Sequence, residues 1–162
     1  MKTMHDDNGR SLAERTEALF RELLDALPEG CASIRRTSET RVVVLEMVPS
    51  RPSAAPISAI VPRDDRQGLT LVAGKGSYFE IPRDGHRYTD QPLFEEVKTI
   101  CSAVIAGRLE EWVALDGADV VRGKGTIGLH RTVTVRWREL SLRAFRHKLR
   151  NHCRYDPWVV PA

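Results

Sequence analysis

Cysteine is scarce in this chain of 162 residues, and its three cysteines are not arranged for a shared ligand or bridge. Cys31, Cys101 and Cys153 are odd in number, lie far apart, and form no C-x-x-C motif. Disulfide frameworks and cysteine zinc sites rely on paired, closely spaced cysteines. The pattern argues against both and indicates a reducing compartment such as the cytoplasm.

Long apolar runs are also absent. No segment approaches the roughly 20 apolar residues that cross a membrane, and the first ten residues, MKTMHDDNGR, lack the apolar stretch of a secretory signal. We therefore expect a soluble cytoplasmic protein without membrane contact. Residues 1–10 are predicted to be disordered, and residues 11–162 to form a single domain of ordinary size.

The glycine-rich segments do not form a nucleotide-binding motif. Residues 74–77 (GKGS) and 123–126 (GKGT) are alike, but a Walker A loop needs G-x-x-x-x-G-K-[ST] at the start of a helix. The second segment also fits G-x-G-x-x-G, yet β-branched residues follow it where a dinucleotide site requires a helix. We interpret both segments as hairpin turns and expect no cofactor.

No catalytic or metal-binding residues stand out. Glu46 is a single carboxylate near a predicted strand end, where a solvated role is favoured. Asp64 and Asp65 lack further oxygen ligands nearby, and the histidines show no paired spacing. We therefore favour a non-enzymatic protein. An enzyme would need a deep polar pocket holding Glu46, His130 or Arg131.

The hydrophobic periodicity predicts an α+β fold. One amphipathic helix begins at the capping box of residues 11–14, and a second covers residues 91–106. Residues 49–56 (PSRPSAAP) are predicted to be an exposed loop, and residues 41–48 a strand covered on both faces. We expect a mainly antiparallel sheet of about six to eight strands, with both helices on one face. The β-type runs are residues 31–36, 41–48, 57–61, 69–73, 77–81, 108–115, 118–122 and 126–137.

Charge is distributed unevenly along the chain. From residue 122 onward there are ten Lys and Arg residues against Glu139 and Asp156, a net charge of +8. The first 121 residues hold the other fifteen basic residues and the other twenty acidic residues, a net charge of −5. Such an asymmetry indicates an anionic partner for the C-terminal part.

A short basic helix is predicted from Ser141 to about Asn151 or slightly beyond. Leu142, Phe145, Leu149 and Cys153 would share its apolar arc. Basic residues would lie beside that arc, and Arg136 precedes them on a predicted strand. The candidate partner-binding residues are Arg136, Arg143, Arg146, His147, Arg150 and Arg154.

Three interpretations of this basic face remain open. The first is a solvated surface paired with the acidic residues of the first helix. The second is a docking face for an acidic protein, and the third is a nucleic-acid-binding face. The order of elements is similar to that of small bacterial binding proteins such as toxin-immunity proteins and secretion chaperones, without a motif that assigns a family. We therefore expect a protein-binding function, with nucleic-acid binding as the alternative and an enzyme third.

Overall fold

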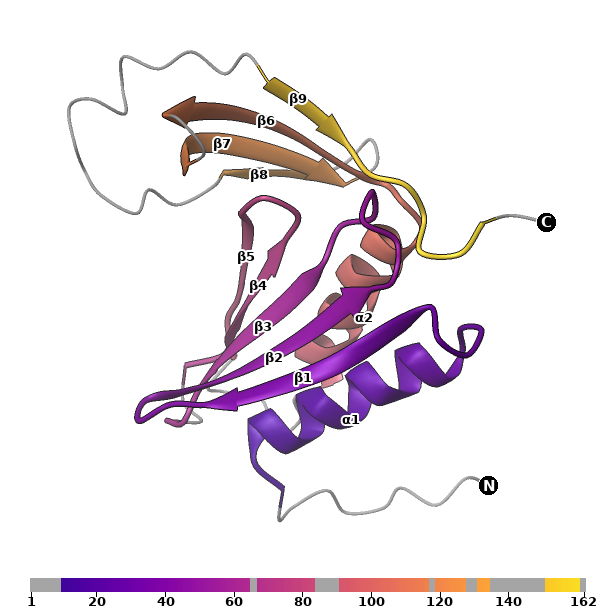
Figure 1. Ribbon diagram of the computed structural model, residues 1–162. Helices are drawn as coiled ribbons and strands as arrows, with labels where there is room; N and C mark the ends of the chain where they lie inside the picture. Colours follow the sequence, from indigo (N-terminus) through magenta and orange to yellow (C-terminus); the bar gives the residue numbers. More distant parts are fainter. Residues whose placement is uncertain are drawn as a thin grey trace.

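The computed structural model describes residues 10–64, 67–83, 91–116, 119–127, 131–134 and 151–160, with the backbone alone described at 115–116, 119–124 and 131–134. These residues form an α+β fold with two helices and nine strands (Figure 1). The elements are α1 (Leu12–Asp25), β1 (Ala32–Ser38), β2 (Val42–Pro49), β3 (Ile57–Pro62), β4 (Leu69–Ala73), β5 (Ser77–Ile81), α2 (Gln91–Ile105), β6 (Leu109–Asp116), β7 (Asp119–Ile127), β8 (Arg131–Thr134) and β9 (Asn151–Arg154).

Helix α1 begins at the predicted capping box. The Glu14 amide donates to Ser11 Oγ at 3.3 Å, and the Ser11 amide donates to a Glu14 carboxylate oxygen at 2.8 Å. Two of the orphan amides at the helix start are thereby satisfied. The helix buries one face, which includes Phe20 and Leu23, so the predicted amphipathic helix is confirmed.

The first five strands form an antiparallel sheet in sequence order, β1-β2-β3-β4-β5. Its register aligns Leu45, Ala59, Leu71 and Phe79 across four strands, and all four side chains are buried. The prediction that β2 is covered on both faces is wrong. Residues 42, 44 and 46 on its other face are partly exposed, because both helices pack on the same side of the sheet (Figure 1).

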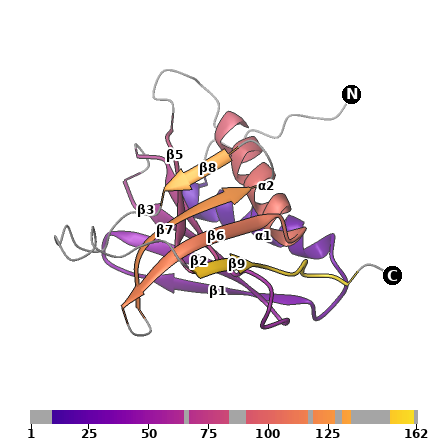
Figure 2. The same cartoon turned by 90° about the horizontal axis from the view of Figure 1, so that it is seen from above.

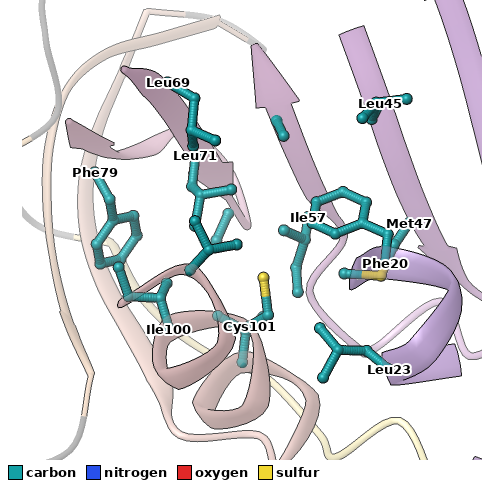
Figure 3. Close-up of a cluster of buried hydrophobic side chains, with 14 of the residues drawn as sticks. Phe20, Leu23, Leu45, Met47, Ile57, Leu69, Leu71, Phe79, Ile100 and Cys101 are labelled. Carbon is teal, nitrogen blue, oxygen red and sulfur yellow. The ribbon is translucent and has the colours of Figure 1, made fainter. Parts of the chain in front are cut away.

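Helix α2 supplies the second half of the core. Its buried face carries Ile100 and Cys101, which meet Phe20, Met47 and Leu71 in one cluster (Figure 3). A fully buried aliphatic or aromatic side chain contributes about 1.5–3 kcal/mol relative to exposure. This cluster therefore holds both helices on the sheet.

The remaining strands form a separate antiparallel sheet in the order β8-β7-β6-β9. The expected arrangement of one sheet with six to eight strands is therefore wrong in its number of strands and in its division. Alternation along a sequence identifies a strand but not its partner, and here β6 pairs with β7 and β9 rather than with β5. The second sheet lies over one end of the first, where β5 contacts β7 and β8 (Figures 1 and 2).

The predicted hairpin turn at residues 123–125 is also wrong. These residues lie within β7, and Gly125 pairs with Glu111 of β6. The other glycine segment, residues 74–76, is the turn between β4 and β5, as predicted.

The segment after β9 returns to the first sheet. Trp158 is 1% exposed, its indole N–H donates to the Ala55 carbonyl at 2.9 Å, and its backbone amide donates to the Ile105 carbonyl at 2.9 Å. The prediction of an exposed loop at residues 49–56 therefore holds only in part, since four of the eight residues are exposed. Ala54 and Ala55 are buried because the C-terminal segment covers them.

No helix in the described ranges is long and apolar enough to cross a membrane. The predicted disorder of residues 1–10 falls almost entirely on residues 1–9, which lie outside the described residues.

Candidate functional site

Of the six candidate partner-binding residues, only Arg154 lies within the described part of the chain. Its side chain is 73% exposed, and its Nε lies 3.2 Å from a carboxylate oxygen of Glu110. Arg136, Arg143, Arg146, His147 and Arg150 lie outside the described residues, as does the predicted helix up to residue 150.

The end of the predicted basic helix is wrong. Asn151–Arg154 is strand β9, which pairs with β6 and aligns Cys153 with Glu111. Local periodicity is only a weak guide over four residues, and hydrogen bonding to the open edge of β6 stabilises an extended backbone instead. Cys153 and Arg154 therefore alternate across a strand and do not share one side of a helix.

The β6–β9 pair carries a polar and aromatic cluster on its outer face. Glu110 lies opposite Arg154 and contacts both Arg154 and His152, with 3.0 Å between His152 Nε2 and a Glu110 oxygen. The rings of His152 and Trp112 are stacked, with centroids 4.6 Å apart and planes 7° from parallel. We call Glu110, Trp112, His152 and Arg154 the outer cluster.

The opposite face of β6 carries a buried carboxylate. Glu111 is 0% exposed, although charged residues are almost never fully buried without partners. Its side chain accepts hydrogen bonds from Ser77 Oγ at 2.6 Å, from the Lys75 amide at 2.8 Å, and from the Tyr155 hydroxyl. These donors come from the β4–β5 turn, from β5 and from the residue after β9, so the carboxylate joins the two sheets. We call Glu111, Ser77, Tyr155 and the Lys75 amide the Glu111 clamp.

Glycine is required at two positions next to the clamp, Gly74 and Gly125. A Cβ atom on Gly74 would lie 2.4 Å from Glu111 Oε2, and one on Gly125 would lie 2.2 Å from Ser77 Oγ. The two similar segments, GKGS and GKGT, thus come together in space. Gly74 allows Glu111 and Tyr155 to approach the β4–β5 turn, and Gly125 allows Ser77 of β5 to approach β7, so both glycines have a structural role.

Tyr155 acts in the clamp as a donor. Burial, and then its hydrogen bond to Glu111, raise the pKa of Tyr155 far above its ordinary value. The hydroxyl therefore keeps its proton across the usual pH range and donates a hydrogen bond to the carboxylate. With three donors directed at it and no exposed surface, Glu111 is suited to joining the sheets rather than to taking a proton from a substrate.

Of the three residues considered as catalytic candidates, the structure describes only the side chain of Glu46. Glu46 lies in the middle of β2, partly exposed, with Arg35 and Ser58 as its register partners. Cys101 is fully buried, and burial raises the pKa of its thiol to about 12, so it is a core residue. His130 and the Arg131 side chain lie outside the described structure.

Two shallow depressions occur on the described surface. One, of about 310 Å³, lies between the end of α1 and the start of β1. The other, of about 320 Å³, lies between the ends of α1 and α2 and the C-terminal segment, and its lining includes Leu27, Ile105 and Val159. Neither includes Glu46 or a residue of the Glu111 clamp.

Comparisons of the chain with protein-family models, with curated proteins and with solved structures give no match.

Sequence reasoning identified neither Glu111 nor Tyr155. The repeated G-K-G-S/T pattern was a signal that could have indicated them, since two glycine segments that meet must leave room for a shared contact. It could not name the carboxylate, because the register of β6 against β7 and β9 decides which residue faces the turn.

Proposed function

We propose that this protein is a non-enzymatic interaction module that binds an acidic protein partner through the basic C-terminal region, residues 122–154. The observation that carries the proposal is the position of β9. Among the described strands it lies at an edge of its sheet, and Asn151, His152 and Arg154 on it are exposed. A strand in this place presents both its side chains and a backbone edge to a partner.

The charge of the region supports an acidic partner. Residues from 122 onward carry a net charge of +8, and such a field speeds association with an oppositely charged surface and selects against basic partners. Two of the four acids of α1 already have other cationic partners. Glu17 contacts Arg21 and Arg36, and Glu22 contacts Lys98. This supports docking over the interpretation in which α1 neutralises the basic face.

The buried ionisable groups have structural roles inside the fold, which also supports a binding function. Glu111 and Tyr155 are hydrogen-bonded to each other between the sheets. Cys101 is sealed in the apolar core. An interaction protein of the kind that the order of elements suggests, resembling immunity proteins or secretion chaperones, needs no reactive group.

Charge reversal tests the proposal. The tagged protein would be used to capture partners from an extract of its own cells, and each recovered partner would be purified and titrated by calorimetry. We expect the Arg143→Glu/Arg150→Glu double variant to lose at least about ten-fold in affinity. The matched control, Arg41→Glu/Arg108→Glu, makes the same charge change at exposed positions outside the C-terminal region and should bind normally. Equal loss in both variants, or in neither, would contradict a C-terminal docking face.

Nucleic-acid binding is the second candidate, and the outer cluster favours it. The stacked rings of Trp112 and His152 lie beside Arg154, and aromatic side chains with nearby cations suit unpaired bases. A fluorescent single-stranded DNA 20-mer tests this at about 50 and about 200 mM salt. Binding should weaken by orders of magnitude between the two conditions, and Trp112→Ala should weaken it further. Absence of binding at the lower salt would exclude this candidate.

A further inference from the structure

Strand β1 forms an open edge of the first sheet. Among the described strands it pairs only with β2, and five of its seven residues are exposed. The strand contains no proline, and seven residues are long enough to template a further strand.

Register and turn bonds show which backbone groups point outward. The Cys31 carbonyl accepts from the Ser50 amide, and the Glu39 amide donates to the Val42 carbonyl, so odd-numbered residues from 31 to 39 bond towards β2. Backbone groups alternate in direction along an antiparallel strand. The N–H and C=O groups of the even-numbered residues therefore point away from the sheet. These residues are Ala32, Ile34, Arg36 and Ser38.

A groove accompanies this edge. The depression of about 310 Å³ lies between the last turns of α1 and the first half of β1, with Leu24 and Ile34 both in its lining. Helix α1 runs alongside β1 (Figure 1). A strand added to β1 would place alternate side chains over this groove and the others on the open face of the sheet.

Charge indicates the chemistry of the added strand. Arg35, on the open face, is exposed, lies opposite Glu46 of β2 in the register, and forms no ion pair within the described residues. Arg36 is held by Glu17 of α1, with 2.6 Å between the charged atoms. Two copies of β1 paired antiparallel about their centre would set Arg35 opposite Arg35, and like charges directly opposite are destabilising. An acidic strand would instead place a carboxylate beside Arg35.

We propose that the outer edge of β1 binds an extended acidic peptide segment of another protein as a sixth strand. Alternate residues of the peptide lie over the groove beside Leu24 and Ile34, and acidic residues between them lie on the side of Arg35. This site lies on the first sheet and does not depend on the proposed C-terminal docking face.

The probe is the capped peptide Thr-Val-Glu-Val-Glu-Val-Thr, with the same peptide carrying Lys in place of Glu as its control. Residue-resolved amide hydrogen exchange of the full chain is the first readout. With the acidic peptide, the amides of Ala32, Ile34, Arg36 and Ser38 should gain protection, whereas those of Ser33, Arg35 and Thr37 are already bonded to β2 and should change little. Protection gained at β9 instead would overturn the proposal, as would lack of binding at about 1 mM peptide.

A charge swap is the second readout. Arg35→Glu should weaken binding of the acidic peptide by at least about ten-fold and allow the Lys peptide to bind. Arg108→Glu, at an exposed position between α2 and β6, is the matched control and should leave both affinities unchanged. Equal binding of the two peptides by the unaltered protein would overturn the proposal. Without peptide, the same four amides could become protected as the protein concentration rises, which would show that a second copy of the chain occupies the edge. This result would also overturn the proposal.

Discussion

In the first sheet, every second residue of β2 to β5 is buried, and nearly all of these residues are apolar. The second sheet, where it meets the first, instead buries a carboxylate and a glycine, Glu111 and Gly125. Apolar packing is non-directional and tolerates exchange of side chains of similar volume. A buried carboxylate depends on each of its donors, because an unsatisfied buried polar group costs about 1–3 kcal/mol. The first sheet should therefore tolerate conservative substitutions better than the junction between the two sheets does.

The largest effect should come from the apolar core. Phe20 is 0% exposed, so Phe20→Ala is expected to lower the free energy of unfolding by about 3–5 kcal/mol through lost burial and a cavity. Urea unfolding measures this change. Phe20→Leu should cost less than half as much, since it retains most of the apolar volume. A loss below about 1 kcal/mol for the alanine variant would show that α1 is not held by this core.

The next effect tests the Glu111 clamp. Glu111→Gln keeps the shape but replaces an acceptor oxygen with an NH₂ group, which opposes one of the three donors. We expect a loss of about 2 kcal/mol in unfolding free energy, with faster amide exchange in β6 and β9 than in β2 and β3. Glu110→Gln, one residue away on the outer face, is the control and should cost less than about 1 kcal/mol. Equal effects of the two variants would contradict the assigned role of Glu111.

A smaller effect is expected at the C-terminal latch, the segment that joins the second sheet back to the first. Trp158→Phe removes the 2.9 Å hydrogen bond to the Ala55 carbonyl while retaining an aromatic ring. The expected loss is about 1 kcal/mol by thermal unfolding. Val160→Ala should change little, since Val160 is 64% exposed. A Trp158→Phe variant as stable as the parent chain would show that the indole N–H is not needed.

The smallest effect concerns the ion pairs between α1 and β1. Hydrogen bonds from Arg21 and Arg36 lower the pKa of Glu17 below its ordinary value of 4.5. Their stabilisation is therefore full above pH 4.5 and is lost as the pH falls through the lowered pKa. Because the arginines are largely exposed, the change should not exceed about 1 kcal/mol. Urea unfolding at neutral and acidic pH measures it, and Glu17→Gln should flatten this part of the pH dependence.

The first sheet and its helices were largely predictable, and the second sheet was not. Helix α1, helix α2 and β1 to β5 follow one another with short connections, and sequential antiparallel pairing needs only local turns. Strand β9 pairs with β6 across about 40 intervening residues, which no local pattern encodes. The contact between Ser77, Glu111 and Tyr155 could not be predicted from the sequence for the same reason.

The candidate partner-binding residues were predictable only as a composition. Ten basic residues after position 121 establish a basic C-terminal region whatever the fold. Their arrangement depends on the backbone, and Arg154 illustrates this, since it lies on an exposed strand beside Glu110 rather than on a helix.

The sequence by itself determined the α+β class, the amphipathic faces of both helices and the five consecutive strands, because each follows from periodicity and turn residues over short stretches. Only the tertiary structure decided that the strands divide into two sheets and that Glu111 is the buried link between them. The physical reason is that strand pairing and buried hydrogen bonds are made between residues far apart in the chain, where the geometry of the whole fold selects the partner.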